Sequence, residues 1–222
     1  MLLSFLESFL IIVLCLFSNV EKPVFNNGNQ NLEQFLDANM VYPWYAKQNC
    51  IQGTIKVAFQ LNSKGELANA KVVNGLGIDL DDEALRLVSL TSGKWKTPKG
   101  YQKNTEIIVP VKFALKNYNC ENLSKQIIEK AITVYQIRQG LEDVVTSYYQ
   151  NKIIGKENSK NEQEILRLKA DLGFDEELVA EKLGEAKEML KQGDQKGACK
   201  VLNFIKNIGF SNADDLIATN CK

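Results

Sequence analysis

Four acidic side chains stand together between residues 79 and 83, and carboxylates at this spacing could bind a metal ion or act as a general acid and base. They are Asp79, Asp81, Asp82 and Glu83. The same residues also fit the start of a helix, where acidic side chains accept hydrogen bonds from free amides and stabilise the helix dipole. We therefore expect Asp81 or Asp82 to cap a helix here, with no catalytic or metal-binding role.

Other groups that catalysis requires are missing from the sequence. The chain has no histidine, which excludes Ser-His and Cys-His pairs and leaves only the rarer lysine-activated nucleophiles. The segment 74–77 contains two glycines but lacks the third glycine and the lysine of a nucleotide-binding loop. Zinc binding is disfavoured because no Cys-x-x-Cys pair is present. We expect a protein that is not an enzyme and that needs no cofactor.

The cysteines indicate disulfide bonds. Cys50, Cys120, Cys199 and Cys221 remain once Cys15, in an apolar N-terminal stretch, is set aside. An even number in an exported chain favours disulfides, with three connectivities open, whereas a cytosolic chain would keep free buried thiols. Our hypothesis pairs Cys50 with Cys120 and Cys199 with Cys221. The first two flank strands that we expect to be antiparallel neighbours, and the last two flank a helical hairpin.

The N-terminal residues 1–20 predict export. Phe9 to Phe17 is a compact apolar stretch followed by Ser18 and Asn19, as in a signal peptide cleaved near that point. A retained membrane anchor is the alternative, although a spanning helix needs about 20 apolar residues. We expect membrane contact only through this segment and a periplasmic location for the rest. Lysine plus arginine equals aspartate plus glutamate, 27 each, so nucleic acid is not an expected partner.

Residues 22–116 show the pattern of a small α+β domain with an antiparallel three-stranded sheet. In the segment 54–61, Ile55, Val57 and Phe59 share one face, which is typical of a half-buried strand. Gly65 supplies the following turn. Pro110 cannot donate a hydrogen bond, so its side of the last strand should be an edge or a bulge. The expected helices span 32–39 and 83–89, with a short one near Ala46, and the expected strands span 54–61, 67–73 and 106–115.

From residue 117 onward the apolar period changes to 3.6, which predicts an all-helical domain over 117–222. One long amphipathic helix runs through residues 123–148, with a bend expected at Gly140. Shorter helices are expected at about 162–171, 175–191, 195–207 and 211–220. The last pair, with Gly193, Ala198 and Ala213, resembles a single tetratricopeptide-type hairpin. One hairpin is too few for a repeat array, which needs about three units.

The aromatic residues Tyr42, Trp44, Tyr45 and Trp95 support two interpretations. In the first, Trp95 and Tyr42 close one end of the small core. In the second, Trp44 and Tyr45 line a groove that receives an extended peptide. The closing strand 106–114 offers a matching edge, because unpaired backbone groups on an edge strand can bind a partner strand.

The landmarks of residues 22–116, taken in order, resemble the C-terminal domain of TonB, the periplasmic end of the energy transducer for outer-membrane receptors. They are Tyr42-Pro43, Gly53, Val57, Phe59, Gly65, residues 80–85, Trp95, Pro98 and residues 110–113. The resemblance implies recognition of a peptide segment of an outer-membrane receptor or another envelope protein by strand addition. The partner-binding residues that we expect are Tyr42, Trp44, Tyr45, Glu106, Ile108, Pro110 and Lys112.

The chain differs from a force-transmitting TonB in its spacer and its anchor. It has four prolines and no histidine, whereas TonB has a long proline-rich spacer and commonly a histidine in its anchor. Fully extended at ~3.4 Å per residue, residues 21–41 reach about 70 Å, less than a typical periplasm. We expect a binding module that is part of, or derived from, energy-dependent transport. The alternative is a scaffold protein whose helical domain is the main interaction surface, and a homodimer is also open.

Overall fold

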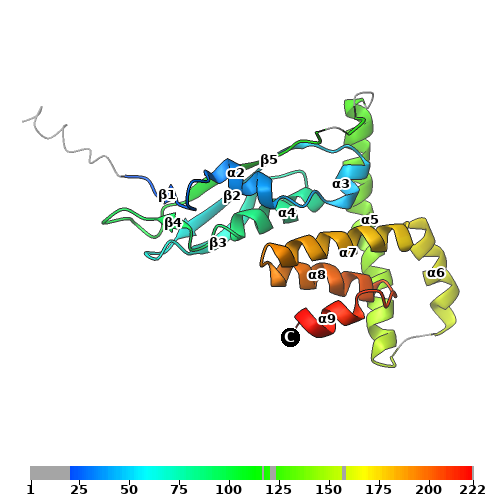
Figure 1. Ribbon diagram of the computed structural model, residues 1–222. Helices are drawn as coiled ribbons and strands as arrows, with labels where there is room; N and C mark the ends of the chain where they lie inside the picture. The colour runs from blue at the N-terminus through cyan, green and yellow to red at the C-terminus, as the bar shows by residue number, and fades with distance from the viewer. Residues whose placement is uncertain (1–20, 117, 121–123, 157–158, 222) are drawn as a thin grey trace, which may run out of the picture.

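The computed structural model describes residues 21–116, 118–120, 124–156 and 159–221 (Figure 1). The predicted export segment, residues 1–20, lies outside this range. Within it, no helix has the length and apolar character needed to cross a membrane. The elements in chain order are β1 (Val24–Phe25), α2 (Leu32–Asn39), α3 (Trp44–Gln48), β2 (Gly53–Leu61), β3 (Leu67–Asn74), α4 (Asp79–Ser89), β4 (Trp95–Lys96), β5 (Ile107–Phe113), α5 (Lys125–Ile153), η1 (Ser159–Asn161), α6 (Glu162–Asp171), α7 (Glu176–Lys191), α8 (Gln195–Asn207) and α9 (Asp214–Asn220).

The sheet domain is built on an antiparallel three-stranded sheet with the order β3-β2-β5. Apolar residues of α2 and α4, among them Leu36 and Leu80, pack against the strands in one core. The helices from α5 onward follow as a separate group in the chain (Figure 1). This arrangement confirms the predicted α+β class. The sequence did not predict β1 and β4, which form a two-residue pair with Phe25 opposite Trp95.

The core of the sheet domain follows the alternation of β2. The residues assigned to its inner face are each at most 1 % exposed: Ile55, Val57, Phe59 and Leu61. The ring of Phe59 lies 5.4 Å from the ring of Trp95, centroid to centroid. The indole Nε1 of Trp95 donates to Thr91 Oγ1 at 3.0 Å. Trp95 is therefore a buried, hydrogen-bonded part of the core, as the first interpretation of the aromatic residues expected.

The β2–β3 turn requires glycine at residue 65. Gly65 has φ of 75°, in the left-handed region that side chains disfavour. A Cβ at this position would collide with the backbone carbonyl of Trp95. The Gly65 carbonyl accepts a hydrogen bond from Gly93 N at 2.8 Å, so the turn lies directly against the segment before β4.

Helix α4 begins earlier than the sequence predicted, and the predicted cap is wrong. The helix starts at Asp79, and its N-cap residue Ile78 makes no side-chain cap. Asp81 instead accepts hydrogen bonds from Leu76 N at 2.9 Å and from Gly77 N at 2.8 Å. The carboxylate therefore stabilises the loop before the helix, because the free amides of Leu76 and Gly77 lie closer to it than those of the first turn.

Helix α5 connects the two halves of the molecule. It runs as one helix of 29 residues through Gly140. Ile128 and Tyr135, in its first half, pack against the core of the sheet domain. Val145 and Tyr148, in its second half, belong to a separate core with residues of α6 and α7. The two halves are thus joined along a shared helix.

Both halves contain a disulfide bond. Cys50 is bonded to Cys120, with Cα atoms 5.6 Å apart, which ties the start of β2 to the segment after β5. Cys199 is bonded to Cys221, also with Cα atoms 5.6 Å apart, which ties α8 to the end of α9. These are the pairs that strand and helix geometry suggested. Each disulfide is expected to stabilise its half by roughly 2–4 kcal/mol.

Candidate functional site

Strand β5 is an edge strand, and its register determines which backbone groups are free. Pro110 lies opposite Lys56 of β2. Because proline has no N–H, these two residues cannot exchange the pair of hydrogen bonds that alternate residues make in an antiparallel ladder. The flanking residues Val109 and Val111 therefore carry the hydrogen bonds to β2. It follows that Ile108 and Lys112 direct their N–H groups away from the sheet.

A groove of about 760 Å³ runs beside β5, between this strand and α2. Apolar side chains line it, including Leu36 from α2 and Val109 from β5. Charged side chains also line it: Glu33 and Asp37 from α2, and Lys112 and Lys116 from β5 and the segment after it. The groove is thus apolar along its length and has acidic groups on one side and basic groups on the other.

The side chains of β5 alternate as the sequence predicted. Val109 and Val111 are buried, whereas Ile108 is 53 % exposed. Pro110 and Lys112 are also exposed. Glu106, just before the strand, forms an exposed ion pair with Lys71 of β3, with nitrogen and oxygen 3.1 Å apart. The predicted residues 106–112 therefore lie together on the open edge and face of the sheet.

Tyr42 is the one predicted aromatic residue that lines the β5 groove. Its hydroxyl donates to the carbonyl of Ile51 at 2.7 Å, and its ring meets the ring of Phe113 edge-on at 5.8 Å. Burial, reinforced by the nearby Asp79, raises the pKa of the Tyr42 hydroxyl above its usual value. Tyr42 is therefore a fixed wall of the groove and stays protonated.

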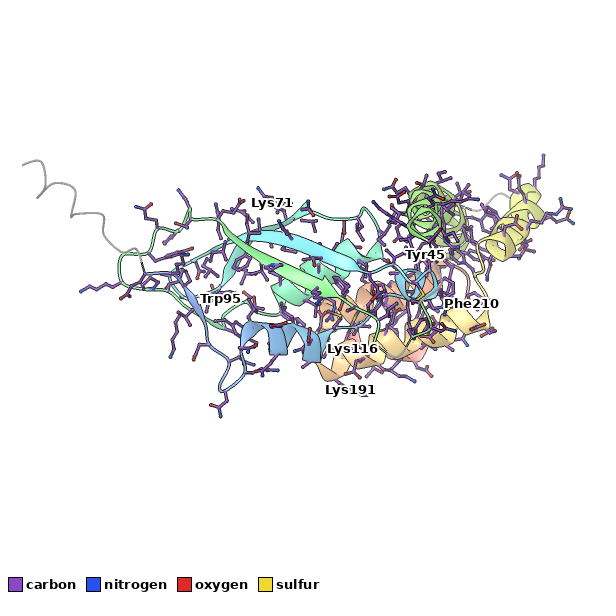
Figure 2. The ribbon with its side chains drawn as sticks, turned by 90° about the horizontal axis from the view of Figure 1, so that it is seen from above. Tyr45, Lys71, Trp95, Lys116, Lys191 and Phe210 are labelled. Carbon is purple, nitrogen blue, oxygen red and sulfur yellow. A yellow bond between two sulfur atoms is a disulfide. The ribbon has the colours of Figure 1, made fainter. Side chains whose placement is uncertain are left out.

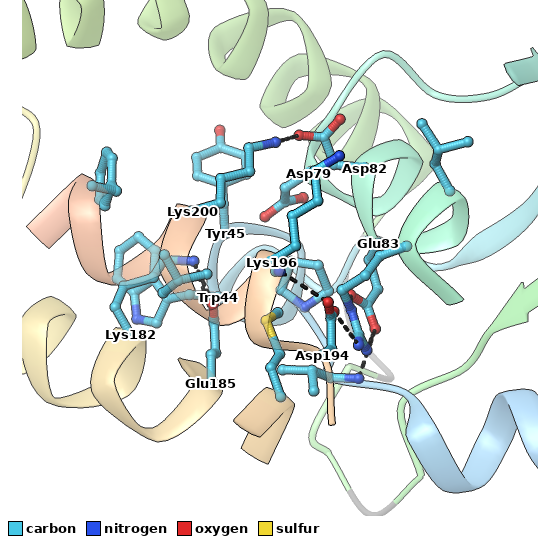
Figure 3. A pocket seen from close by; sticks show the side chains of 18 of the residues that line it. Trp44, Tyr45, Asp79, Asp82, Glu83, Lys182, Glu185, Asp194, Lys196 and Lys200 are labelled. Carbon is cyan, nitrogen blue, oxygen red and sulfur yellow. Dashed lines mark hydrogen bonds and ion pairs between the residues drawn. The ribbon is translucent and has the colours of Figure 1, made fainter. Parts of the chain in front are cut away.

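Trp44 and Tyr45 lie elsewhere, which corrects the expectation that they share a groove with β5. They line a second cavity of about 800 Å³, between α3, α4, α5, α7 and α8 (Figure 3). We call it the junction cavity, because it lies where the sheet domain meets the helices. The Tyr45 hydroxyl donates to the Ala131 carbonyl of α5 at 2.8 Å, and its ring lies 4.8 Å from that of Tyr135. Trp44 packs against the core around Val145. Both residues attach the sheet domain to the helices, because α3 turns them away from β5.

Arg86 holds this junction together through buried charges. Its Nε donates to Glu83 Oε2 at 2.7 Å, and its Nη1 donates to Asp194 Oδ2 at 3.1 Å. The Arg86 and Asp194 side chains are each 11 % exposed, and Glu83 is 4 % exposed. Glu83 also accepts from Val41 N at 2.8 Å. Burial raises the pKa of Glu83, and the Arg86 guanidinium opposes that rise.

Asp79 lines the junction cavity with a buried carboxyl group whose pKa is raised. Burial raises the pKa of its carboxyl to about 6, although the Ala46 amide, 3.3 Å from Oδ2, favours the charged form. Within the described part of the chain, Asp79 Oδ1 and Trp44 Nε1 are buried without a hydrogen-bond partner. No group of three or more Cys, Asp or Glu side chains in the described residues could hold a metal ion.

Comparison with known families addresses the sheet domain. The model of the Gram-negative bacterial TonB protein C-terminal family matches residues 38–115. Residues 38–115 are a TonB C-terminal domain. The match extends from the end of α2 to just past β5, so it includes the open edge, and the helices from α5 onward lie outside it. Searches of curated proteins and of solved structures found no match to the chain.

The TonB C-terminal family is associated with transport at the cell envelope and binds proteins there, including outer-membrane receptors. It is a family of energy-transduction and protein-interaction domains without enzymatic activity. Residues 38–115 therefore carry a domain of a family whose members bind proteins at the cell envelope.

Two parts of the site were missed by sequence reasoning. The acidic pair Glu33 and Asp37 has helical i, i+4 spacing, but nothing in the sequence placed that face of α2 beside β5. Arg86 and Glu83 have i, i+3 spacing, which indicates an ion pair on a helix. Their third partner, Asp194, is 108 residues from Arg86 in the sequence. Only the packing of α8 against α4 brings it close.

Proposed function

We propose that the protein binds an extended segment of an outer-membrane receptor, or of another envelope protein, by strand addition at β5. The observation that carries this proposal is the pair of outward N–H groups, on Ile108 and Lys112, beside the apolar groove. Backbone hydrogen bonds to an edge strand supply affinity, and neighbouring pockets select the side chains. The family match over residues 38–115 supports the same mode.

The other edge of the sheet is a poorer template. The pairing of β3 with β2 contains two register shifts, and Asn69 of β3 has φ of 53°. The N–H of Leu67 is already bonded to Ser92 Oγ at 3.0 Å. Irregularities of this kind protect an edge from pairing. The pairing of β5 with β2 is regular from Phe113 to Ile107, which leaves β5 as the strand that a partner can join.

The chemistry of the groove defines the kind of segment that fits. Alternate side chains of an added strand point to opposite faces of the sheet. One set would enter the apolar groove near Leu36 and Tyr42, and the other would lie beside Ile108 on the open face. A basic residue of the added strand could form an ion pair with Asp37, and an acidic residue could form one with Lys112. Pro110 leaves one position without a donor, so pairing is interrupted there.

The test is peptide binding by a variant that loses one outward donor. The probe is a synthetic peptide copied from the N-terminal plug segment of an outer-membrane receptor of the same cell. Ile108→Pro should abolish binding in calorimetry while the protein stays folded. Ile108→Ala is the matched control, because it removes the side chain but keeps the N–H, and it should bind. Unchanged binding by a folded Ile108→Pro protein would contradict strand addition at β5.

We also propose a periplasmic location, with residues 1–20 acting as a cleaved signal or a retained anchor. The two disulfides support an oxidising compartment. Mass spectrometry of the N-terminus of the mature protein distinguishes cleavage from retention. An N-terminus at residue 1 in a soluble extract with reduced cysteines would contradict both alternatives.

The scaffold function remains the second candidate, and the observation that favours it is the exposed apolar surface of α5. Truncation after residue 116 is a poor test, because it also removes Ile128 and Tyr135 from the core of the sheet domain. Point substitutions on the exposed face of α5 separate the two functions without that damage.

A further inference from the structure

The outer face of α5 carries an apolar stripe that its own chain leaves exposed. Five side chains form it, with exposed fractions from 42 % to 67 %: Ile127, Val134, Ile137, Leu141 and Val144. Ile128 and Tyr135 lie away from the stripe and pack on the sheet domain, whereas Tyr148, one heptad after Leu141, is buried with residues of α6, so the exposed stripe ends at Val144. Seen close to its axis in Figure 2, α5 lies between the sheet domain on one side and α6 on the other. Apolar residues on a helix are normally covered, so a stripe that the described residues leave exposed is a candidate contact surface.

The spacing of the stripe is that of a helix–helix seam. From Val134 the apolar residues follow at alternating steps of three and four, and Ile127 lies one heptad earlier. A 3.5-residue repeat keeps such side chains facing a partner helix, in knobs-into-holes packing. We propose that α5 pairs with α5 of a second copy of this chain along this stripe.

The position of Gly140 supports close approach of a partner helix to α5. It lies in the interior of α5, where glycine lowers helix stability relative to alanine. A Cβ at Gly140 would meet no atom within 4 Å among the described residues, so nothing in its own chain requires glycine there. Gly140 belongs to the row that flanks the stripe, together with Thr133 and Ser147. Small residues in such a row let two helix backbones approach closely.

Charge and symmetry favour an antiparallel pair. In a parallel pair, Lys130 would meet Lys130 of the partner subunit within the seam. In an antiparallel pair, Val134 meets Val144 of the partner subunit, and Ile137 meets Leu141 of the partner subunit. Gly140 then lies near the two-fold axis, beside Gly140 of the partner subunit. Such an isologous contact closes after two copies.

The flanks of the stripe fit a second copy better than a lipid surface. A helix that lies on a membrane carries lysine and arginine along its polar flanks. Here one flanking row is uncharged: Gln126, Thr133, Gly140 and Ser147. On the other flank, Arg138 is bonded to Glu142 of its own helix at 2.8 Å and to the Leu172 carbonyl, so it is held toward its own subunit. A second copy therefore meets no unpaired like charge.

The first test is the mass of the exported full-length product in solution. Sedimentation at about 100 µM should give twice the mass of one mature chain, as measured for the same sample by mass spectrometry under denaturing conditions. Ile137→Glu should give a single chain with unchanged circular dichroism. Gln150→Glu adds the same charge at an exposed position of α5 off the stripe, and it should remain a dimer. A monomeric wild type at that concentration, or a dimeric Ile137→Glu protein, would overturn the proposal.

The second test fixes the alignment and separates this contact from β5. A Gly140→Cys protein should form a covalent dimer in the oxidising envelope, because a disulfide needs Cα atoms within about 7 Å. Absence of that covalent dimer would contradict the antiparallel alignment. Ile108→Pro should remain a dimer, and Ile137→Glu should still bind the receptor peptide. Loss of the dimer in Ile108→Pro would place the contact at β5 and overturn the pairing of α5.

Discussion

The β5 groove and the junction cavity have similar volumes, about 760 Å³ and 800 Å³, but their polar groups differ in kind. In the groove, the outward backbone groups of Ile108 and Lys112 have no strand to pair with among the residues that the structure describes. In the cavity, most of the charged side chains are paired with one another: Arg86 with Glu83 and Asp194, Lys182 with Glu185, and Lys200 with Asp82. The unpaired backbone groups, more than the volume, are the reason for proposing β5 as the binding face.

Aromatic residues that are neighbours in the sequence are likewise divided between the groove and the cavity. Tyr42 lines the groove, and Trp44 and Tyr45 line the cavity. Pro43 lies between them with an extended backbone, and helix α3 begins at Trp44. A change of backbone direction over one residue thus divides these side chains between the proposed binding face and an internal contact.

The largest expected effect comes from the core that supports β5. Phe59→Ala removes a fully buried ring that packs on Trp95, and it should lower the free energy of unfolding by about 3–5 kcal/mol. Urea unfolding followed by tryptophan fluorescence measures the change. Ile108→Ala, at an exposed position of β5, should change stability by less than about 0.5 kcal/mol. Equal effects in the two variants would mean that the inner and outer faces of the sheet are reversed.

The next effect tests whether the junction is held by paired charge. Arg86→Met leaves Glu83 buried without its partner and should lower the free energy of unfolding by about 3 kcal/mol. Lys200→Met is the control: it breaks an ion pair whose side chains are 75 % and 71 % exposed, so its cost should stay below about 1 kcal/mol. If both variants cost the same, the Arg86 contacts do not hold the junction. Peptide binding at β5 should persist in both.

A third prediction concerns how the stability of the protein depends on pH through Asp79 in the junction cavity. The folded pKa of Asp79, about 6, lies above the ordinary 3.8, so the folded state holds this proton more tightly than the unfolded state. The free energy of unfolding therefore falls as pH rises through this window. Asp79→Asn should be more stable than the wild type by about 3 kcal/mol at neutral pH and should lose that gain near pH ~4. Thermal melts across this range test the prediction, and a gain in stability that does not depend on pH would contradict the raised pKa of the Asp79 carboxyl.

The smallest expected effects come from conservative substitutions of Tyr42 in the β5 groove and Trp44 in the junction cavity. Tyr42→Phe loses the hydrogen bond to Ile51 and should cost about 1 kcal/mol. Trp44→Phe removes a buried N–H that has no partner among the described residues. The stability lost with the smaller ring and the stability gained by removing that donor should nearly cancel. Of the two, only Tyr42→Phe should weaken peptide binding. Weaker binding in Trp44→Phe alone would move the binding site to the junction cavity.

Local patterns made much of the fold predictable. The period-two alternation of β2 and the period-3.6 runs of α6 to α9 placed these elements within a few residues of their observed bounds, because each buries one regular face. The cap of α2 at Asn31 was also predictable, since its side chain accepts from Gln34 N at 2.9 Å within one turn. Pro110 predicted an edge or a bulge because it has no N–H to donate, and the strand order places β5 at the edge.

Contacts between distant segments were not predictable from the same patterns. Tyr45 reaches Ala131, 86 residues away, and Arg86 reaches Asp194. Neither contact has a local signature, so Tyr45 was assigned to peptide binding on its residue type alone. The β1–β4 pair is two residues long on each side, too short for an alternation to be visible.

Hydrogen exchange at single amides tests strand addition most directly. Without peptide, the amides of Val109 and Val111 should exchange slowly, because they bond to β2, and those of Ile108 and Lys112 should exchange fast. Adding the receptor peptide should slow exchange at Ile108 and Lys112 and leave the amides of α4 and α8 around the junction cavity unchanged. Protection that appears around the junction while Ile108 and Lys112 still exchange fast would contradict the account.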